Sequence, residues 1–316
     1  MLRKMTEIII YVREDGIFYF FSIFVAWYLT QNNINIIFRT NIKNEKNKII
    51  IPFGVEQQEI LFSNKIYRML DNKSNFYKFL TKINKTNIKL IKTNIKLIKT
   101  YDEKYIKNNG ENIKKNFIIK PNDGFGSKGI INKEDYIYNL IKEYPEYQIQ
   151  DIINNDCGYE LSCVCKNGKI ISSICIKTKL ANRSVFSYVK GITGEVCYKK
   201  DLLKFAELVL KEIKYNGFIE FEFIKDKNNI YIMECNARIS GWVNNEYYYE
   251  QIIIPYLNEF YNLSIQSKLN YSKNQKIIFS DFDSRVNLIY NMIFDNKKFD
   301  NILNCKDFFY DFLHNV

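Results

Sequence analysis

Two glutamates that face each other on an expected β-hairpin give the sequence its clearest chemical signal. The segment from Gly217 to Asn236 reads as two strands joined by a polar, asparagine-rich turn. A hairpin that is symmetric about Asn228 places Glu222 opposite Glu234, and Asn236 then points to the same face. The same register gives the pairs Phe223–Met233 and Asp226–Ile230.

Those side chains suggest a metal site. Two carboxylates opposed across a strand pair lie about 5 Å apart, and at an effective dielectric constant near 20 they repel by roughly 3 kcal/mol. A cation bound between the two carboxylates would replace this repulsion by attraction. Glu222, Glu234 and Asn236 offer only oxygen ligands, which suits Mg²⁺ bridging to phosphates. Arg238 is next on that face and could reach the same phosphates. The alternative is an edge hairpin with a solvated acidic face, which the flanking Phe, Ile and Met residues oppose.

A glycine-rich loop lies between two expected strands. The first strand ends at Lys120, the second begins at Ile130, and Gly124, Gly126 and Gly129 between them let backbone amides approach a phosphate. The spacing is formally G-x-G-x-x-G. No Gly-Lys-Ser/Thr closes a Walker A loop, and a strand follows where a dinucleotide fold has a helix. The motif predicts a phosphate-covering hairpin, with an ordinary glycine-rich turn as the alternative.

Composition limits the classes of function. The chain has 316 residues, 47% of them hydrophobic, and a formal net charge of +11 that comes largely from lysine. These values predict a globular chain of two or three subdomains. The charge is compatible with nucleotides or anionic substrates, whereas a nucleic-acid partner is not expected.

Cysteine and histidine usage narrows the chemistry. Seven cysteines occur without any C-x-x-C pair, so we expect reduced thiols in a cytoplasmic protein, and Cys163 and Cys165 read as strand residues of one face. The chain has one histidine, His314, close to the end of the sequence. This scarcity of histidine argues against Ser-His-Asp and Cys-His catalysis and against histidine-rich metal sites. The most apolar run, Ile17–Leu29, is too short to span a bilayer and reads as a core helix, and no signal peptide is evident.

The elements that must position these residues alternate between strand and helix. The first 52 residues predict a small, open α/β domain without a glycine-rich fingerprint after its first strand. Expected strands are Glu7–Val12, Asn35–Phe38, Lys48–Pro52, Phe117–Lys120, Tyr147–Ile153, Glu160–Cys165 and Lys169–Lys177. Expected helices are Ile17–Leu29, Val55–Leu70, Asp71–Leu80, Lys133–Tyr144 and Asp201–Lys214.

One heptad is duplicated. Residues 86–92 read TNIKLIK, and residues 93–99 repeat them letter for letter. The lysines follow a helical period while Ile-Lys-Leu alternates like a strand. We predict that the first copy prolongs the helix or loop and that the second forms the strand. A basic nucleic-acid helix is the alternative to a solvated face.

In this order the motifs resemble the ATP-grasp superfamily, in its biotin-carboxylase and carbamoyl-phosphate-synthetase-like branch. The resemblance covers roughly residues 48–262. It rests on Asp71-Asn72-Lys73, Ile118-Ile119-Lys120-Pro121 with the glycine loop, Gln150-Asp151-Ile152-Ile153, Gly158-Tyr159-Glu160, Phe221-Glu222-Phe223 and Met233-Glu234-Cys235-Asn236-Ala237-Arg238.

The resemblance implies a role for each motif. ATP would lie between two α+β subdomains. Lys73, Lys120 and the loop residues Gly124, Gly126, Ser127 and Gly129 would hold its phosphates. Gln150, Asp151, Ile152 and Ile153 would hold adenine, and Glu160 the ribose. Glu222, Glu234 and Asn236 would bind Mg²⁺ or Mn²⁺. Arg238, with Lys120, would stabilise the transferring phosphoryl group.

Some positions depart from the family pattern. Many relatives carry Glu at the position of Gln150, which puts the adenine contact in doubt. The duplicated heptad lies between Lys73 and Lys120, and a shift of Lys73 would remove that ligand. Lys177 and Arg183 fall where relatives place substrate or phosphate contacts, without a secure alignment.

The resemblance implies a two-subdomain ATP-grasp fold of mixed α/β and α+β class, and a ligase that activates a carboxylate as an acylphosphate for attack by an amine or a thiol. The expected domains are 1–70, the N-terminal α/β domain; 71–153, the linker helix and glycine-loop lid; 154–262, the metal-binding subdomain; and 263–316, a mostly helical extension. Expected partners are a small-molecule carboxylate and a nucleophile, without nucleic acid or membrane, and a homodimer is left open. The alternatives are an ATP-binding regulator without ligase activity, a basic nucleic-acid-binding protein and a dinucleotide oxidoreductase.

Overall fold

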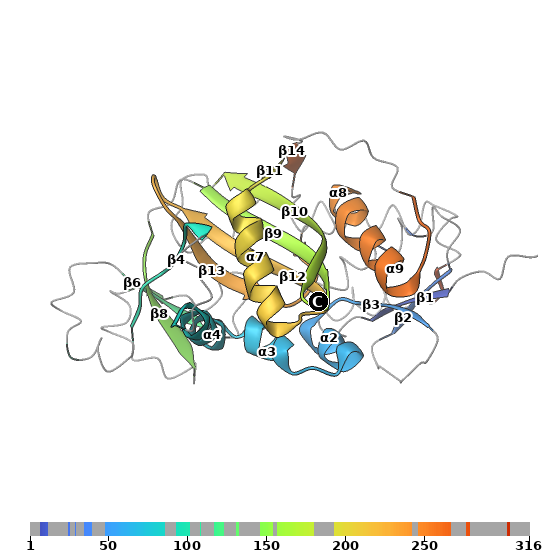
Figure 1. The fold of residues 1–316 in the computed structure, drawn as a ribbon, viewed down its shortest axis with the longest axis horizontal. Helices are drawn as coiled ribbons and strands as arrows, with labels where there is room; N and C mark the ends of the chain where they lie inside the picture. Colours follow the sequence, from blue (N-terminus) through green and yellow to red (C-terminus); the bar gives the residue numbers. More distant parts are fainter. Residues whose placement is uncertain are drawn as a thin grey trace, which may run out of the picture.

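The computed structural model describes most of the chain from Lys48 to Gln266 together with short flanking segments (Figure 1). The described residues are 7–11, 25, 29, 35–39, 48–85, 93–101, 108, 117–122, 131–132, 146–153, 157–179, 193–241, 246–266, 276–278 and 302–303. The glycine loop (Gly124, Gly126, Ser127, Gly129), the expected helix 133–144, the first heptad copy and Arg183 lie outside them.

A parallel four-stranded sheet forms the N-terminal part: three of its strands are the predicted ones, and the fourth, β15, comes from the extension that was expected to be mostly helical. Its strands are β1 (Glu7–Tyr11), β2 (Asn35–Arg39), β3 (Ile49–Pro52) and β15 (Ile302–Leu303), in the order β15-β2-β1-β3. Val25 and Leu29, from the expected core helix, are helical and fully buried. Tyr256 and Tyr261 of helix α9 (Ile254–Tyr261) both donate hydrogen bonds to the carbonyl of Ile50 at 2.9 Å, so this helix packs on the sheet.

The expected single helix 55–70 is wrong. The segment forms α2 (Val55–Phe62) and α3 (Ile66–Asp71). Ser63 between them adopts a left-handed φ of 50°, and the side chain of Asn64 accepts a hydrogen bond from the amide of Ile66 at 3.0 Å. Ser and Asn side chains compete with the helix for backbone groups, which explains the break. Helix α4 follows at Lys73–Lys85.

A seven-stranded sheet is the centre of the molecule. Its strand order is β14-β11-β10-β9-β12-β13-β4. The strands are β4 (Ile95–Leu97), β9 (Cys157–Lys166), β10 (Lys169–Lys179), β11 (Thr193–Cys197), β12 (Gly217–Lys225), β13 (Ile230–Asn236) and β14 (Lys276–Ile278). The second heptad copy supplies β4, which runs parallel to β13, as predicted.

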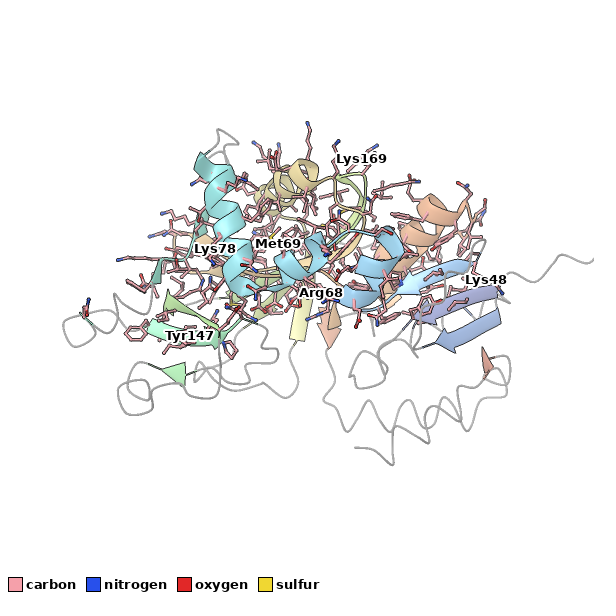
Figure 2. All side chains as sticks on the ribbon, turned by 90° about the horizontal axis from the view of Figure 1, so that it is seen from below. Lys48, Arg68, Met69, Lys78, Tyr147 and Lys169 are labelled. Atoms are coloured by element: carbon pink, nitrogen blue, oxygen red, sulfur yellow. The ribbon has the colours of Figure 1, made fainter. Side chains whose placement is uncertain are left out.

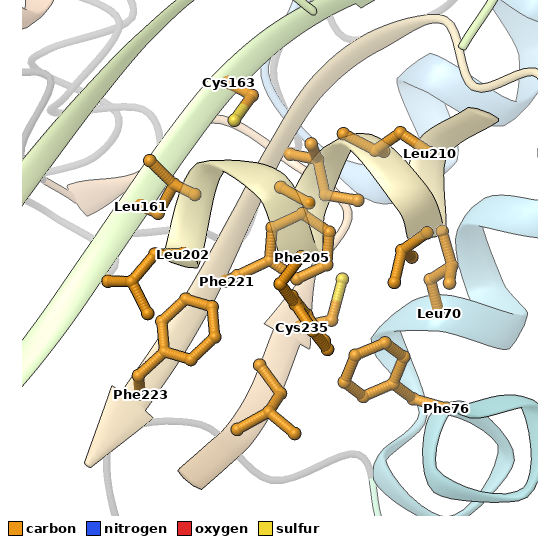
Figure 3. Packing of buried hydrophobic residues seen from close by; sticks show 14 of the residues in the cluster. Leu70, Phe76, Leu161, Cys163, Leu202, Phe205, Leu210, Phe221, Phe223 and Cys235 are labelled. Atoms are coloured by element: carbon orange, nitrogen blue, oxygen red, sulfur yellow. The ribbon is translucent and has the colours of Figure 1, made fainter. Parts of the chain in front are cut away.

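Helix α7 (Lys200–Ile213) crosses one face of this sheet and buries the main core there (Figures 1 and 3). Phe205 packs edge-on against Phe221 and Phe223, with ring centroids 5.8 and 5.6 Å away. Side chains alternate along a strand. Since Phe221 and Phe223 lie on the α7 face of the sheet, Glu220, Glu222 and their cross-strand partners lie on the opposite face.

A third sheet carries the glycine-loop strands. Its order is β5-β8-β6-β7, with β5 (Thr100–Tyr101), β6 (Phe117–Pro121), β7 (Ile131–Asn132) and β8 (Tyr147–Asp151). Strands β6 and β7 pair antiparallel, so the expected strand and the returning strand lie side by side, as in a hairpin. Phe117, Ile119 and Ile149 build a small core on one face, and Lys120 lies opposite Gln148 on the other.

The C-terminal part follows the glutamate hairpin. It comprises α8 (Glu246–Tyr248), a π-helical turn (Tyr249–Ile253) and α9 (Ile254–Tyr261). In the expected helical extension 263–316, the described secondary structure is the two short strands β14 and β15, and most of the extension lies outside the described residues. No helix in the described part of the chain is both long and apolar enough to cross a bilayer. Side chains such as Lys78 and Lys169 are exposed, as expected of a solvated lysine-rich surface (Figure 2).

Candidate active site

Three glutamates share one rung of the central sheet. Glu160 on β9 is directly opposite Glu222 on β12, and Glu222 is directly opposite Glu234 on β13. All three therefore point to the sheet face that α7 does not cover. The predicted opposition of Glu222 and Glu234 is confirmed, and Glu160 joins it from a third strand.

The rest of the predicted hairpin register is wrong. Phe223 pairs with Ile232 instead of Met233, and Lys225 instead of Asp226 pairs with Ile230. Asp226 belongs to the turn, where its carboxylate accepts hydrogen bonds from the amides of Asn228 and Asn229 at 2.9 and 2.6 Å. A register shift between Glu222 and Phe223 leaves Met233 as an extra residue on β13, which is a β-bulge.

The glutamate rung is electrostatically unbalanced. Burial raises the pKa of Glu222 well above its usual range, and Glu234, Glu220 and Glu160 raise it further by charge repulsion. Arg238 offsets only part of this effect. A bound cation would relieve the repulsion, so the site favours a positively charged ligand.

Two buried lysines meet the rung from other elements. Lys73 begins α4, is 8% exposed, and places its Nζ 3.5 Å from Oε2 of Glu234. Lys120, on β6, is 6% exposed. Burial lowers the pKa of Lys120, while Glu234 and Glu222 raise it in part and Lys73 lowers it further. The duplicated heptad has thus not displaced Lys73, and both ammonium groups lie in the field of the glutamates.

Glu220 is a site residue that the sequence analysis missed. It lies opposite Asn236, is 2% exposed, and its Oε2 is 3.9 Å from Nη1 of Arg238. The amide of Asn236 donates to Oε1 of Glu222 at 2.6 Å and to Oε2 of Glu220 at 3.2 Å. Its position two residues before Glu222, on the same face of β12, was the available signal.

Asp71 also joins the site at the end of α3. Its Oδ1 accepts a hydrogen bond from the amide of Ala237 at 3.3 Å. Burial raises the pKa of Asp71, and the nearby charges of Arg238 and Lys73 lower it in part. Asp71 therefore ties α3 to the chain segment that carries Asn236 and Arg238.

The residues expected to hold a base follow β8. Gln150 is fully buried, and among the residues that the structure describes neither its amide oxygen nor its amide nitrogen has a hydrogen-bond partner. The side-chain oxygen of Gln148 is likewise without a partner. Asp151 accepts a hydrogen bond from the hydroxyl of Tyr101 at 2.5 Å, and the half-buried Ile152 and Ile153 follow it. Buried polar atoms without hydrogen-bond partners are costly, so this strand fits a polar ligand that supplies the missing partners.

Lys177 is not part of this assembly. It lies opposite Tyr159 on β9 and Glu195 on β11, whereas Glu160, the next residue of β9, has Ile176 as its partner. Its side chain therefore points to the α7 face of the sheet, away from the glutamates.

The oxygen donors of the site make up only part of a ligand set for a divalent ion. Within the described ranges, no three His, Cys, Asp or Glu side chains lie close enough together to hold a metal by themselves. Glu222 and Glu234 supply opposed carboxylates, and Asn236 directs its amide nitrogen at Glu222, which leaves its carbonyl oxygen as an acceptor. Such a partial set fits a hard ion that takes its remaining ligands from a phosphate-bearing molecule.

Sequence comparison identifies the domain that carries this site. Residues 70–242, more than half of the chain, match the ATP-grasp domain family. The chain belongs to the ATP-grasp family. The match spans α4, the glycine-loop sheet and the glutamate hairpin of this ATP-grasp protein. No curated protein matches the chain in sequence.

Solved structures share the ATP-grasp fold at low sequence identity. Carboxyaminoimidazole ribonucleotide synthase from Aspergillus clavatus, complexed with ATP, has a TM-score of 0.57 at 12% identity, over 87% of this chain and 81% of that one. N5-carboxyaminoimidazole synthetase from Staphylococcus aureus has a TM-score of 0.53 at 14% identity, over 95% and 98%. The biotin carboxylase domain of Hydrogenobacter thermophilus 2-oxoglutarate carboxylase has a TM-score of 0.50 at 12% identity, over 76% of this chain and 65% of that one.

Proposed function

We propose that this ATP-grasp protein is an ATP- and Mg²⁺-dependent ligase (Mn²⁺ serving in place of Mg²⁺) that joins a small carboxylate to an amine or a thiol. The carboxylate oxygen attacks the γ-phosphorus of ATP, ADP leaves, and an acylphosphate forms. The nucleophile then attacks the acyl carbon and phosphate leaves. The observation that carries the proposal is the meeting of the glutamate rung with Lys73, Lys120 and Arg238.

The nucleotide would lie between the third sheet and the central sheet. Lys73 and Lys120 would hold its phosphates, with Gly124, Gly126, Ser127 and Gly129 of the glycine loop above them. The buried amide of Gln150 and the end of β8 at Asp151, Ile152 and Ile153 would receive the base, and Glu160 the ribose.

Glu222, Glu234 and Asn236 would hold the divalent ion, which when bound neutralises phosphate charge during transfer. Arg238, held near Glu220, would face the phosphoryl group as it moves. The chain's own contribution is positioning and electrostatic stabilisation, which do not require a histidine base. Burial of Lys73, Lys120 and Glu220 strengthens these interactions because it excludes water.

We also propose the domain division 1–70, 71–153, 154–262 and 263–316. One strand crosses it, because β4 from the second segment pairs with β13 of the third. We place the reaction in the cytoplasm, with small-molecule partners and no nucleic acid or membrane, and with a homodimer as the assembly to test. The loops around Lys177 to Thr193 and the N-terminal domain would choose the substrates.

Glu234→Gln tests the proposal. The substitution keeps the size of the side chain but removes the charge that faces Glu222 and Lys73, so ADP release should fall by at least about 100-fold while ATP binding partly survives. ADP release is measured over a panel of carboxylates paired with amines and thiols. Undiminished turnover in this variant would contradict the metal assignment.

Glu195→Gln is the matched control. Glu195 belongs to the same sheet, on β11, but pairs with Lys177 and points to the α7 face. Its substitution should leave ADP release unchanged. Saturable ATP binding by the parent protein without ADP release on any pair in the panel would favour the alternative of an ATP-binding regulator.

A further inference from the structure

Two cysteines face each other on neighbouring strands, away from the glutamates. Cys175 on β10 is directly opposite Cys197 on β11, and their sulfur atoms are 3.6 Å apart, a hydrogen-bonding distance for thiols. In the described strands no other cysteine has a thiol as its cross-strand partner, since Cys157, Cys163, Cys165 and Cys235 oppose other residue types. The pair is therefore distinct in its geometry.

The backbone at this pair already suits a covalent bond between the sulfurs. Directly opposed residues of antiparallel strands have Cα atoms about 4.5–5.5 Å apart, and disulfides span Cα separations of about 4.4–6.8 Å. Rotation of the two side chains about their Cα–Cβ bonds would suffice to join them. The strands would not need to move.

The two thiols differ in reactivity. Cys197 is half-buried, whereas Cys175 is 6% exposed. The hydrogen bond with Cys175 lowers the pKa of Cys197, burial and Glu195 oppose this, and Lys199 and Lys177 lower it further. Burial raises the pKa of Cys163, Cys165 and Cys235 well above the ordinary range. Cys197 is therefore the accessible sulfur with the most thiolate character among these.

We propose that Cys197 and Cys175 form an oxidative modification site that reacts with a hydroperoxide and closes to a reversible disulfide. The Cys197 thiolate attacks the terminal peroxide oxygen, the O–O bond breaks, a sulfenic acid forms, and the other oxygen leaves as hydroxide (from hydrogen peroxide) or as an alkoxide (from an organic hydroperoxide). The Cys175 sulfur then attacks the sulfenic sulfur, an S–S bond forms, and the oxygen leaves as water. Two thiols lose two electrons, and the hydroperoxide gains them.

This site is separate from the glutamate rung. Cys175 lies opposite Leu161 of the α7-side core, so the thiol pair belongs to the sheet face opposite to Glu160 and Glu222. The modification does not depend on the proposed ligase activity. Its chemistry can be measured on the full-length protein without nucleotide.

The experiment treats the reduced protein with hydrogen peroxide, blocks free thiols with an alkylating reagent and maps the peptides after trypsin. Cys175 falls in the peptide 170–177 and Cys197 in the peptide 191–199, each with one cysteine. The expected product is these two peptides joined, two hydrogen atoms lighter than their sum, and separated again by dithiothreitol. Peptide pairs that do not join, or a joined pair that excludes Cys197, would overturn the proposal.

Three variants sharpen the result. Cys175→Ser should stop at a Cys197 sulfenic acid that dimedone traps, and Cys197→Ser should abolish both products. Cys157→Ala is the matched control, because Cys157 is similarly buried but opposes Lys179 and Lys225, and it should leave the cross-link intact. If a variant fails to fold, the alkylation rates of the parent's thiols decide, with Cys197 expected to react at least about tenfold faster than Cys163.

Discussion

Glu220 shows how one unanticipated charge can organise the residues around it. Its carboxylate contacts both Asn236 and Arg238, two residues of the expected catalytic set that belong to the next strand and its end. Groups that orient metal ligands without binding the metal commonly affect ion affinity by 10–100-fold. Glu220 is therefore expected to act as a positioning residue.

Glu220→Gln should raise the Mg²⁺ concentration that gives half-maximal ADP release by about tenfold, because the neutral amide no longer attracts Arg238 and competes for Asn236. Calorimetric titration of Mg²⁺ into the protein with ATP gives a readout apart from turnover. Glu207→Gln, an exposed position on α7, is the control and should change neither value. Equal Mg²⁺ dependence in the Glu220 variant and the parent would contradict the positioning role.

The opposition of Glu222 and Glu234 was predicted correctly, but for reasons that only partly hold. The true turn holds four residues, Asp226 to Asn229, which moves the register by one, and the bulge at Met233 moves it back by one. The two offsets cancel at the glutamates. Counting residues symmetrically about the turn cannot reveal either offset. Local packing determines whether an aspartate accepts hydrogen bonds from the turn amides and whether a bulge residue is left unpaired.

At the scale of elements, the Asp226 turn fixes the hairpin that carries the metal ligands. Hydrogen bonds from the amides of Asn229 and Asn228 lower the pKa of Asp226. A carboxylate with a lowered pKa stabilises the folded state above its unfolded pKa of about 3.9, and this contribution is lost as the pH falls through the folded value.

Asp226→Ala should therefore lower the melting temperature by a constant amount between pH 8 and pH 5, and the difference from the parent should shrink below about pH 4. Thermal unfolding followed by circular dichroism checks this. Lys227→Ala in the same turn is the control and should show no such pH dependence. A difference that persists unchanged at pH 3 would refute the role of the ionised carboxylate.

Helix α2 is fastened to the central sheet by one glutamine. The fully buried amide of Gln58 donates to the carbonyls of Ala237 and Phe218 at 2.6 and 2.8 Å, and its oxygen accepts from the amide of Phe218 at 2.6 Å. Ala237 precedes Arg238, so the same contact helps to place the site.

Gln58→Met should destabilise the protein by about 3 kcal/mol, because it leaves buried backbone groups of Phe218 and Ala237 unsatisfied. Urea unfolding measures the change. Gln57→Met is the control, since the buried side-chain oxygen of Gln57 has no hydrogen-bond partner in the described part of the chain and its removal should be nearly neutral. Similar losses in both variants would contradict the specific role of Gln58.

Elements with strong local signals were predicted well. The turn of β9 and β10 holds Asn167 and Gly168, both with positive φ, at 55° and 77°, as an Asn-Gly hairpin requires. The expected helix 201–214 differs from α7 by one residue at each end. The break at Ser63 was missed because the residues on both sides of Ser63 and Asn64 have a helical composition, which outweighs two polar residues when the segment is considered as a whole.

At the scale of the whole molecule, the site depends on contacts that no local pattern contains. Lys73, Lys120 and Glu234 come from three different elements, and only the family resemblance indicated that these three side chains meet. Periodicity can state which face a side chain takes, but it cannot state which faces meet.

Because the site joins residues from several elements, a ligand bound there should stabilise the whole fold. If ATP and Mg²⁺ bind there, saturation at about 100 times the dissociation constant adds about 2.7 kcal/mol and should raise the melting temperature by about 5 °C. Differential scanning fluorimetry with ATP, with Mg²⁺ and with both measures this. In Glu234→Gln the increment due to Mg²⁺ should vanish, and a parent protein unaffected by Mg²⁺-ATP would contradict the nucleotide site.

The second heptad copy has a consequence for how this family member can vary. It occupies β4 beside β13, whereas the first copy, residues 86–92, adds to the length of sequence between the end of α4 and Thr93 and lies outside the described residues. Doubling a tether costs only about 0.6 kcal/mol in closure entropy. Segment lengths at this point can therefore drift during evolution, while the lysine at the start of α4 keeps its distance from Glu234.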